Sequence, residues 1–246
     1  MSDYGCIAEF YDGLTKDVDY KEFADFYDEI FASYGAKPEI VADLACGTGT
    51  LTALLSERGY DSVGIDASPD MLSIAFEKTA EAEKKPLFLC QRLEELDLYG
   101  TIDAAICSLD GINHIPPENL DEVFGKISMF LNPDGIFIFD ILSPEALEAL
   151  DGEMFMDETE DVFCVWRCEY DDEEDACTYG FDFFARSGDV WSRHSEEHVE
   201  YAYERQVIEE KLIKNGFCDV RVFGDLRLAA PSADERRIFI AAKKKQ

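Results

Sequence analysis

Short apolar runs alternate with amphipathic segments along the middle of the chain, and this alternation restricts the fold more than any other feature. Helical spacing of apolar residues separates successive runs, and strands that alternate with helices imply parallel strands joined by right-handed crossovers. We therefore predict a doubly wound, mostly parallel α/β sheet with helices on both faces. The expected strands are residues 40–46, 62–67, 87–91, 102–108 and 136–141, and closing strands at 219–223 and 237–242 bring the sheet to seven.

Local signals place the helices between these strands. Apolar residues at helical spacing predict a helix over Asp19–Tyr34, which Gly35 ends. Ser68 followed by Pro69 is typical of a helix N-cap with proline in the first position. A further amphipathic helix carries Leu120, Val123, Phe124, Ile127 and Leu131.

The alternation stops after Ile141. Residues 162–170, 176–186 and 190–201 look like three longer strands separated by turns, which is typical of antiparallel hairpins. Such strands do not belong inside a doubly wound sheet. We therefore expect one unit formed by residues 1–151 and 201–246, interrupted by an antiparallel β subdomain at 152–200. This insert either covers an acceptor site or serves as a contact in a homodimer.

Charge and composition exclude several kinds of partner. The 246 residues carry a formal net charge of −32, which repels nucleic acid and attracts cationic ligands. No run approaches the roughly 18 apolar residues of a membrane helix. The start MSDYGCIAEF has neither a basic segment nor an apolar middle, so we expect a cytoplasmic protein without membrane association.

No metal site is expected. The chain contains no CxxC pair, which argues against structural zinc. His194 and His198 lie on one expected strand, where four residues span about 13 Å, too far for a single ion.

The stretch VADLACGTGTL, residues 41–51, places Gly47 and Gly49 where the first strand turns into a helix. Glycine permits a positive φ and lets a ligand approach the backbone. A dinucleotide fingerprint would need a third glycine where Thr52 stands, and a P-loop motif is absent. Asp43 before the glycines would repel phosphate and attract an ammonium group.

Asp66 ends the second strand in VGIDAS, where a carboxylate can accept both hydroxyls of a ribose. The alternative is an N-cap for the following helix, but Ser68 fills that role better.

With these residues a resemblance becomes plain. DLACGTGTL, GIDASPDML and LNPDGIFIFDI resemble the sequence blocks of class I S-adenosylmethionine (SAM)-dependent methyltransferases, which have a Rossmann-like fold. The spacing agrees over residues 39–141, and KLIKNGF with the two closing strands agrees as well. AEFYDGLTKDVDY resembles the N-terminal segment of a small-molecule-type subgroup that carries an antiparallel insert after the fifth strand.

The resemblance implies SAM as cofactor and a role for each matching position. Asp43 would face the methionine ammonium, and Asp66 would hold the ribose. The backbone cradle of the cofactor would be formed by Ala45, Cys46, Gly47 and Gly49. The adenine would be flanked by Ala67 and Met71, and the methyl group would lie near Leu109 and Asp110. The methionine end would be covered by Tyr11 and Tyr20.

Two positions depart from the family pattern. Ala45 stands where the family usually has glycine, which narrows the approach of the ligand. Arg92 stands where the family often has an acid that accepts the adenine amino group, and arginine cannot accept a hydrogen bond. Either the backbone at Arg92 and Leu93 contacts the adenine, or Gln91 or Glu94 takes the place of the acid.

The predicted activity is in-line transfer of a methyl group to a small-molecule acceptor. The cofactor supplies the activation, and the protein aligns the reactants and excludes water. Where the acceptor must lose a proton, Asp110 and His114 in SLDGINHI are the candidate bases. Two alternatives stay open: a SAM-binding regulatory protein without transferase activity, and a nicotinamide-dependent oxidoreductase, which Thr52 disfavours.

Overall fold

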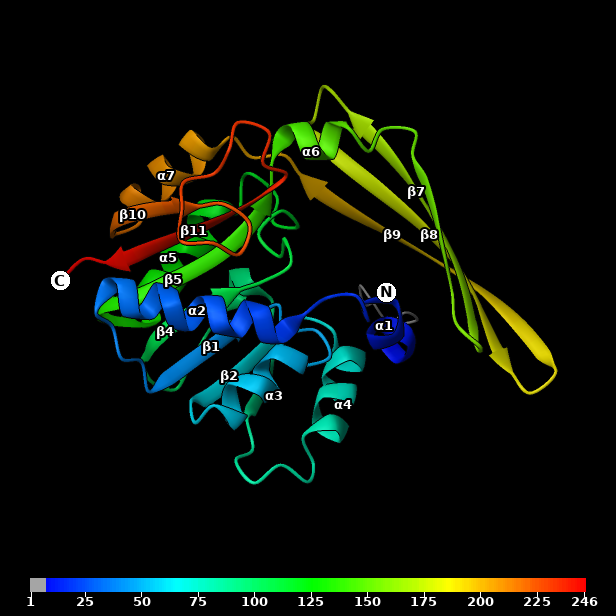
Figure 1. The fold of residues 1–246 in the computed structure, drawn as a ribbon, viewed down its shortest axis with the longest axis horizontal. Coiled ribbons are helices and arrows are strands. Elements are labelled where there is room, and N and C mark those ends of the chain that lie inside the picture. Colours follow the sequence, from blue (N-terminus) through cyan, green and yellow to red (C-terminus); the bar gives the residue numbers. More distant parts are fainter. Residues whose placement is uncertain (1–7) are drawn as a thin grey trace.

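A seven-stranded sheet forms the centre of residues 8–246, the part of the chain that the computed structural model describes (Figure 1). The strand order is β10-β11-β5-β4-β1-β2-β3, with β1 to β5 parallel and β11 antiparallel to both of its neighbours. This confirms the predicted doubly wound, mostly parallel sheet. The strands are β1 (Ile40–Leu44), β2 (Asp61–Asp66), β3 (Leu87–Cys90), β4 (Ile102–Cys107), β5 (Leu131–Leu142), β10 (Phe217–Phe223) and β11 (Arg237–Lys244).

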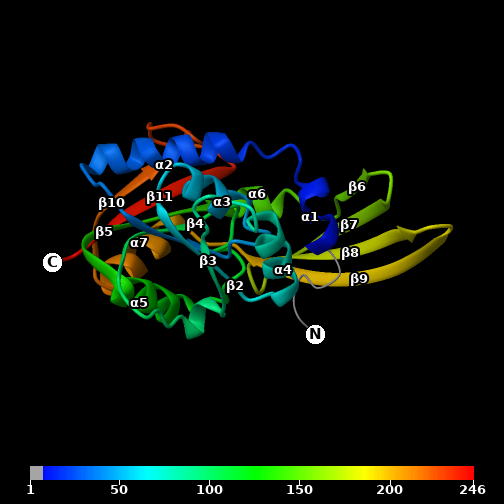
Figure 2. The same ribbon diagram turned by 90° about the horizontal axis from the view of Figure 1, so that it is seen from below.

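Helices cover both faces of this sheet. Figure 2 shows α2 (Tyr20–Tyr34) and α3 (Thr50–Glu57) on one side, and α5 (Leu120–Phe130) and α7 (Arg205–Lys214) on the other. Successive residues of a strand point to opposite faces, so Val41 packs in the cluster under α2 and α3 while Ala42 packs in the cluster under α5 and α7. A fifth helix, α4 (Pro69–Lys78), packs beside β3.

The caps explain where the helices begin and end. The Asp19 carboxylate accepts hydrogen bonds from the N–H groups of Lys21 and Glu22, so α2 starts one residue after its cap. Gly35, at φ 67°, ends that helix in the left-handed region. Ser68 Oγ accepts from the N–H of Met71 at the start of α4, as the sequence predicts.

A second, antiparallel sheet follows β5, in the order β6-β7-β8-β9. It has four strands, so the prediction of three was wrong. The edge strand β6 is short and exposed, and its sequence MFMDE lacks the polar–apolar alternation by which half-buried strands are recognised. The strands are β6 (Met154–Glu158), β7 (Val162–Asp171), β8 (Ala176–Ser187) and β9 (Val190–Tyr201). The division into units at 152 and 200 stays a prediction, and residues 1–7 of the first unit lie outside the described residues.

One face of this second sheet packs against the core. Cys164 and Phe183 belong to a buried cluster with Ala8 and Met71, which come from α1 (Ala8–Leu14) and α4. Near the other end of the sheet, Cys168 and Cys177 pack on Leu147 of α6 (Pro144–Glu148). Figures 1 and 2 show the β8–β9 hairpin extending well beyond the core from this base.

Three short helices were not predicted. Helices α1 and α6 and the 3₁₀ turn η1 (Leu93–Glu95) are too short to repeat an apolar face, so periodicity could not reveal them. Within residues 8–246, no helix combines the length and the apolar character that crossing a membrane requires.

Candidate active site

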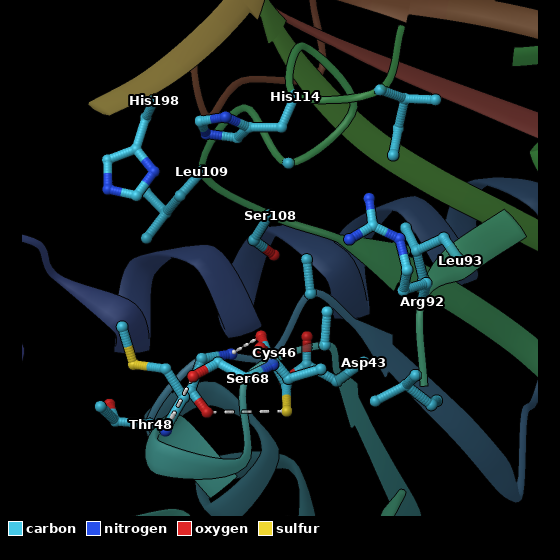
Figure 3. Close-up of a pocket in the computed structure, with 18 of the residues that line it drawn as sticks. Asp43, Cys46, Thr48, Ser68, Arg92, Leu93, Ser108, Leu109, His114 and His198 are labelled. Carbon is cyan, nitrogen blue, oxygen red and sulfur yellow. Dashed lines mark hydrogen bonds between the residues drawn. The ribbon is translucent and has the colours of Figure 1, made fainter. Parts of the chain in front are cut away.

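A cavity of about 390 Å³ lies at the carboxyl ends of β1, β2 and β4, where doubly wound sheets bind ligands (Figure 3). The structure brings fourteen of the sixteen predicted site residues to its wall; the exceptions are Gly49 and Asp110. The fourteen are Tyr11, Tyr20, Asp43, Ala45, Cys46, Gly47, Asp66, Ala67, Met71, Gln91, Arg92, Leu93, Leu109 and His114.

Asp43 is a buried carboxylate on β1, with only 2% of its surface exposed. Thr52 Oγ1 donates a hydrogen bond to it at 2.5 Å, and within residues 8–246 no lysine or arginine forms a salt bridge with it. Burial raises the pKa of Asp43 to about 7, although the bond from Thr52 acts in the opposite direction. Such a group gains strongly from a cationic ligand.

The Asp66 side chain links the loop after β1 to the loop after β2, and both loops line the cavity. Its Oδ2 accepts the N–H of Gly47 at 2.8 Å, and its Oδ1 accepts the N–H of Ser68 at 2.8 Å. Burial raises the pKa of Asp66, and these backbone bonds oppose the rise. Each carboxylate oxygen keeps further acceptor capacity that a ligand hydroxyl can use.

The two glycines of the first loop have different surroundings. At Gly47, φ is +53° and a Cβ would meet no protein atom within 4 Å, so the backbone there is open to a ligand. At Gly49, φ is +70° and a Cβ would lie 2.8 Å from the Ala75 Cβ and 3.0 Å from Phe88. Gly49 therefore permits close packing of α4 and β3 on the loop, and it does not line the cavity. Ala45 also has a positive φ, +54°, a conformation that glycine adopts more readily.

The loop after β3 carries the residues that the sequence offers in place of the usual acid. Both polar atoms of the Gln91 amide bond to the backbone of Asp97, so this side chain is engaged elsewhere. Glu94 lines the cavity one turn later, where Asn119 donates to it at 3.3 Å and Arg92 Nε lies 3.6 Å away. All four residues of the alternatives that the sequence leaves open, Gln91, Arg92, Leu93 and Glu94, line the cavity, and of the two polar side chains proposed as acceptors only that of Glu94 has no hydrogen bonds to the backbone of Asp97.

The loop after β4 is held by a buried acid. Leu109 and Asp110 have φ near +55°, and their N–H groups donate to Asp140 at 2.8 and 2.9 Å. Arg237 pairs with Asp140 and lies 2.6 Å from Asp110. Burial raises the pKa of Asp140 to about 6, and Arg237 opposes the rise. The Asp110 carboxylate is thus engaged in an ion pair, whereas His114 lines the cavity.

Sequence reasoning missed the part of the wall that β9 supplies. Glu197, His198, Val199 and Tyr201 line the cavity beside His114, whose Nδ1 lies 3.1 Å from the Val199 carbonyl oxygen. A signal existed for His198 in EEHVE, residues 196–200, where acids stand two residues before and two residues after it. The other lining residues, Glu197, Val199 and Tyr201, occupy the alternate positions and carry no such signal. From the sequence, His198 is considered only with His194 as a possible metal pair, and that possibility is rejected on their spacing.

These features fit SAM. The cavity combines an open glycine turn at Gly47, a carboxylate at the end of β2 suited to a diol, and a buried carboxylate at Asp43 suited to an ammonium group. Its wall has no lysine and a single arginine, Arg92, among the described residues, which suits a cation better than a phosphate.

Comparison with known proteins agrees. Residues 41–135 match a family model described as a methyltransferase domain. YqeM of Bacillus subtilis (strain 168), named as a methyltransferase, is 32% identical over 98% of this chain and 97% of its own. A SAM-dependent methyltransferase from Clostridium acetobutylicum ATCC 824 is 31% identical, and its crystal structure superposes with a TM-score of 0.88 over 99% of each chain. A glycine/sarcosine N-methyltransferase of Parasynechococcus marenigrum (strain WH8102) is 28% identical over 89% of this chain and 78% of that protein.

The motifs, the fold and these relatives point to one family, whose cofactor is SAM. The chain belongs to the class I SAM-dependent methyltransferases.

Proposed function

We propose that this enzyme methylates a small molecule that binds between the cofactor loops and β9. One observation carries the proposal: a single continuous cavity is lined both by the loops after β1 and β2 and by Glu197, His198 and Val199 of the second sheet. Binding of the cofactor alone would require only the wall formed by the loops after β1 and β2. The second wall lines the same cavity and so provides contacts for a second ligand beside the cofactor.

The residues of the first wall have distinct proposed roles toward the cofactor. Asp66 accepts the ribose hydroxyls, Asp43 faces the ammonium group, and the backbone at Gly47 follows the ligand closely. Tyr11 and Tyr20 cover the methionine part from the N-terminal segment. When bound, SAM supplies a methyl group on a positively charged sulfur, which is already activated for displacement.

The chain's own contribution is alignment and exclusion of water. Leu109 and the neighbouring backbone are fixed by Asp140, so the wall beneath the acceptor is rigid. His114 lines the acceptor side and is the candidate base, because Asp110 is already paired with Arg237.

A small acceptor is favoured over a macromolecule. Specific ligand cavities measure roughly 300–1,000 Å³, and this one, at about 390 Å³, falls in that range. The net charge of −32 opposes binding of nucleic acid. The Parasynechococcus relative is named for two small amino acids. We assign the second sheet the role of acceptor cover, with a homodimer contact as the alternative.

The test is isotope transfer. The protein is incubated with a small-molecule extract and SAM labelled in its methyl group, and labelled products are sought by mass analysis. The appearance of a labelled small molecule supports the proposal. Tight SAM binding without any labelled product would instead favour a regulatory SAM-binding protein, and NADH binding more tightly than SAM would favour an oxidoreductase.

Two variants test the cofactor wall itself. We expect SAM to bind in the micromolar range, about 8 kcal/mol. Asp66→Ala should weaken this by about 1.5–3 kcal/mol, because charge-assisted hydrogen bonds are lost. Asp70→Ala, at an exposed position of α4 outside the cavity wall, is the matched control. Equal affinities of the two variants in calorimetry would remove Asp66 from the site.

A further inference from the structure

Two histidine–carboxylate pairs stand at the acceptor end of the cavity. His114 Nε2 lies 3.8 Å from Oε1 of Glu200, and His198 Nε2 lies 3.4 Å from Oε2 of Glu196. Figure 3 shows both imidazoles at the same end of the cavity, across from Cys46 and Ser68 of the cofactor loops. Both rings belong to the cavity wall, so a ligand beside the cofactor meets them together.

The ring of His114 has a defined orientation. Its Nδ1 lies 3.1 Å from the carbonyl oxygen of Val199, and a carbonyl can only accept, so Nδ1 carries a hydrogen. In the neutral ring Nε2 is then the basic nitrogen. That nitrogen is the one beside Glu200, which also receives a hydrogen bond from Tyr179 at 3.2 Å.

The second ring is held by the sheet. The edge-on contact of His198 with Phe181 has ring centroids 5.3 Å apart. Both side chains of the pair are largely buried, with 7% of His198 and 13% of Glu196 exposed. Buried acids gain most from a nearby positive charge, because water does not compensate them.

On the basis of the proposed function, we propose that the methyl acceptor carries a basic nitrogen, which His114 and His198 contact while Glu200 and Glu196 behind them balance its positive charge. A cationic acceptor would supply the positive charge that the buried carboxyl groups of Glu200 and Glu196 favour, whereas a neutral acceptor brings no such charge. The two histidines contact the acceptor. The two glutamates orient the imidazole rings and balance the positive charge that the acceptor brings.

A proton step follows from this arrangement. A protonated amine has no free electron pair, so it must lose a proton before it can attack carbon. The proton passes from the amine nitrogen to Nε2 of His114, the electron pair of the broken N–H bond stays on the amine, and the positive charge moves to the imidazole. Burial raises the pKa of Glu200, and the Asp110 charge adds to the rise. A bound cation favours the charged form of Glu200, and any proton that its carboxyl group loses passes to water.

A divalent metal ion fits this end of the cavity less well than a basic nitrogen does. Ligand atoms of Asp110, His114 and Glu200 lie within 4.8 Å of one another. The guanidinium of Arg237 lies 2.6 Å from Asp110, however, so an ion there would meet a fixed positive charge.

The experiment compares amines with neutral molecules of the same shape. Calorimetry on the protein saturated with the demethylated cofactor, S-adenosylhomocysteine, measures three pairs at neutral pH: benzylamine and benzyl alcohol, D-glucosamine and D-glucose, and glycinamide and glycolamide. At least one amine should bind about tenfold more tightly than its partner, as expected for a charge-assisted contact. In Glu200→Gln and in Glu196→Gln this preference should fall to about threefold or less.

Controls separate this inference from the proposed function. Glu169→Gln removes one charge from an exposed position of β7 and should leave the preference unchanged, and Glu200→Asp should restore part of it. All variants should bind S-adenosylhomocysteine as the unchanged protein does; failure of the unchanged protein to bind it would contradict the proposed function instead. Equal binding of amines and neutral partners, no binding of any amine, or a preference that survives both Gln variants overturns the inference.

Discussion

Asp43 is a buried carboxyl group, and the proposed role toward the cofactor would let it contribute affinity at a cost in stability. Its carboxylate is buried, and the pKa of about 7 means that the folded protein prefers the protonated form over most of the acidic range. The penalty is the desolvation of a charge, and the compensation is a cation that only the ligand brings. The stability of the protein should therefore depend on pH differently with and without bound SAM.

The folded pKa of Asp43 lies above its ordinary value of 3.8, so its contribution to stability is greatest below pH 3.8 and is lost as the pH rises to about 7. Asp43→Asn keeps an acceptor for Thr52 but has no charge. We expect this variant to be more stable than the unchanged protein without ligand at pH 8, by an amount on the order of a few kcal/mol, and to lose this advantage near pH 4.

Thermal melting across this pH range, with and without SAM, measures both effects. The stabilisation by SAM at pH 8 should be smaller in Asp43→Asn, because the ammonium group loses its buried partner. A variant that is no more stable than the unchanged protein at pH 8 would show that Asp43 is not a buried charge. An undiminished response to SAM would remove it from the cofactor site.

Gly47 tests the open backbone beside the cofactor. Gly47→Val should still fold, because a Cβ there meets no protein atom, but should lose SAM affinity by about 100-fold or more, because the side chain would occupy ligand space. Gly35→Val is a matched control: Gly35 has φ +67°, has the same open surroundings and lies at the end of α2. Both variants should lose about 1–2 kcal/mol of stability from the positive φ, and calorimetry should find normal binding only in Gly35→Val. Normal binding by both would mean that the turn at Gly47 is only structural.

At the scale of elements, Asn113 joins the two sheets. Asn113 is fully buried, and its side chain donates from Nδ2 to the Tyr201 carbonyl at 3.0 Å and accepts at Oδ1 from the Leu142 N–H at 3.1 Å. Its main-chain carbonyl accepts from the Tyr201 N–H at 2.7 Å. The loop after β4, the end of β5 and the end of β9 therefore meet at one amide.

Asn113→Ala should lower the free energy of unfolding by about 3 kcal/mol, because it leaves buried backbone groups of β5 and β9 without partners. Asn119→Ala, which removes a single 3.3 Å bond to Glu94, should cost about 1 kcal/mol or less. Denaturant titration of both variants measures the difference. Equal costs would show that the join between the sheets does not depend on this amide.

The elements that the sequence predicts well are those whose apolar pattern repeats. The five parallel strands and helices α2, α4 and α5 have such patterns or clear caps. Helix α1 and strand β6 have neither, and α1 depends on tertiary contacts such as the packing of Ala8 on Met71 and Phe183. Helix α6 begins with a Ser143–Pro144 cap but is too short to repeat an apolar face. Local sequence carries little information about elements of this kind.

The site divides in the same way. Its proposed cofactor side follows largely from local motifs, and thirteen of the fourteen predicted residues in the cavity wall belong to that side, the exception being His114. Its acceptor side depends on how β9 returns to the core, and His198 comes to face His114 only through that long-range packing. Gly49 was predicted to contact the ligand, but it packs against Ala75 and does not line the cavity. A glycine motif does not reveal which of these two surroundings each glycine has.

At the scale of the whole molecule, the net charge of −32 gives the protein a negative electrostatic field. SAM carries one net positive charge at neutral pH, whereas its product S-adenosylhomocysteine has a neutral sulfur. We therefore expect the field to favour binding of SAM over binding of S-adenosylhomocysteine, which assists replacement of the product by the substrate. Salt should reduce this difference, because the screening length falls from about 10 Å at 0.1 M to about 3 Å at 1 M.

We therefore expect the dissociation constant of SAM to rise about threefold or more between 0.05 and 0.5 M sodium chloride, while that of S-adenosylhomocysteine changes less. Calorimetry is the appropriate measurement, since salt also relieves the repulsion within an acidic protein and so raises its melting temperature without any ligand. Asp43→Asn should show a weaker salt dependence for SAM if part of the attraction is local, and an unchanged one if the whole field is responsible. The same salt dependence for SAM and S-adenosylhomocysteine would show that the acidity of the chain serves solubility and plays no part in choosing the cofactor.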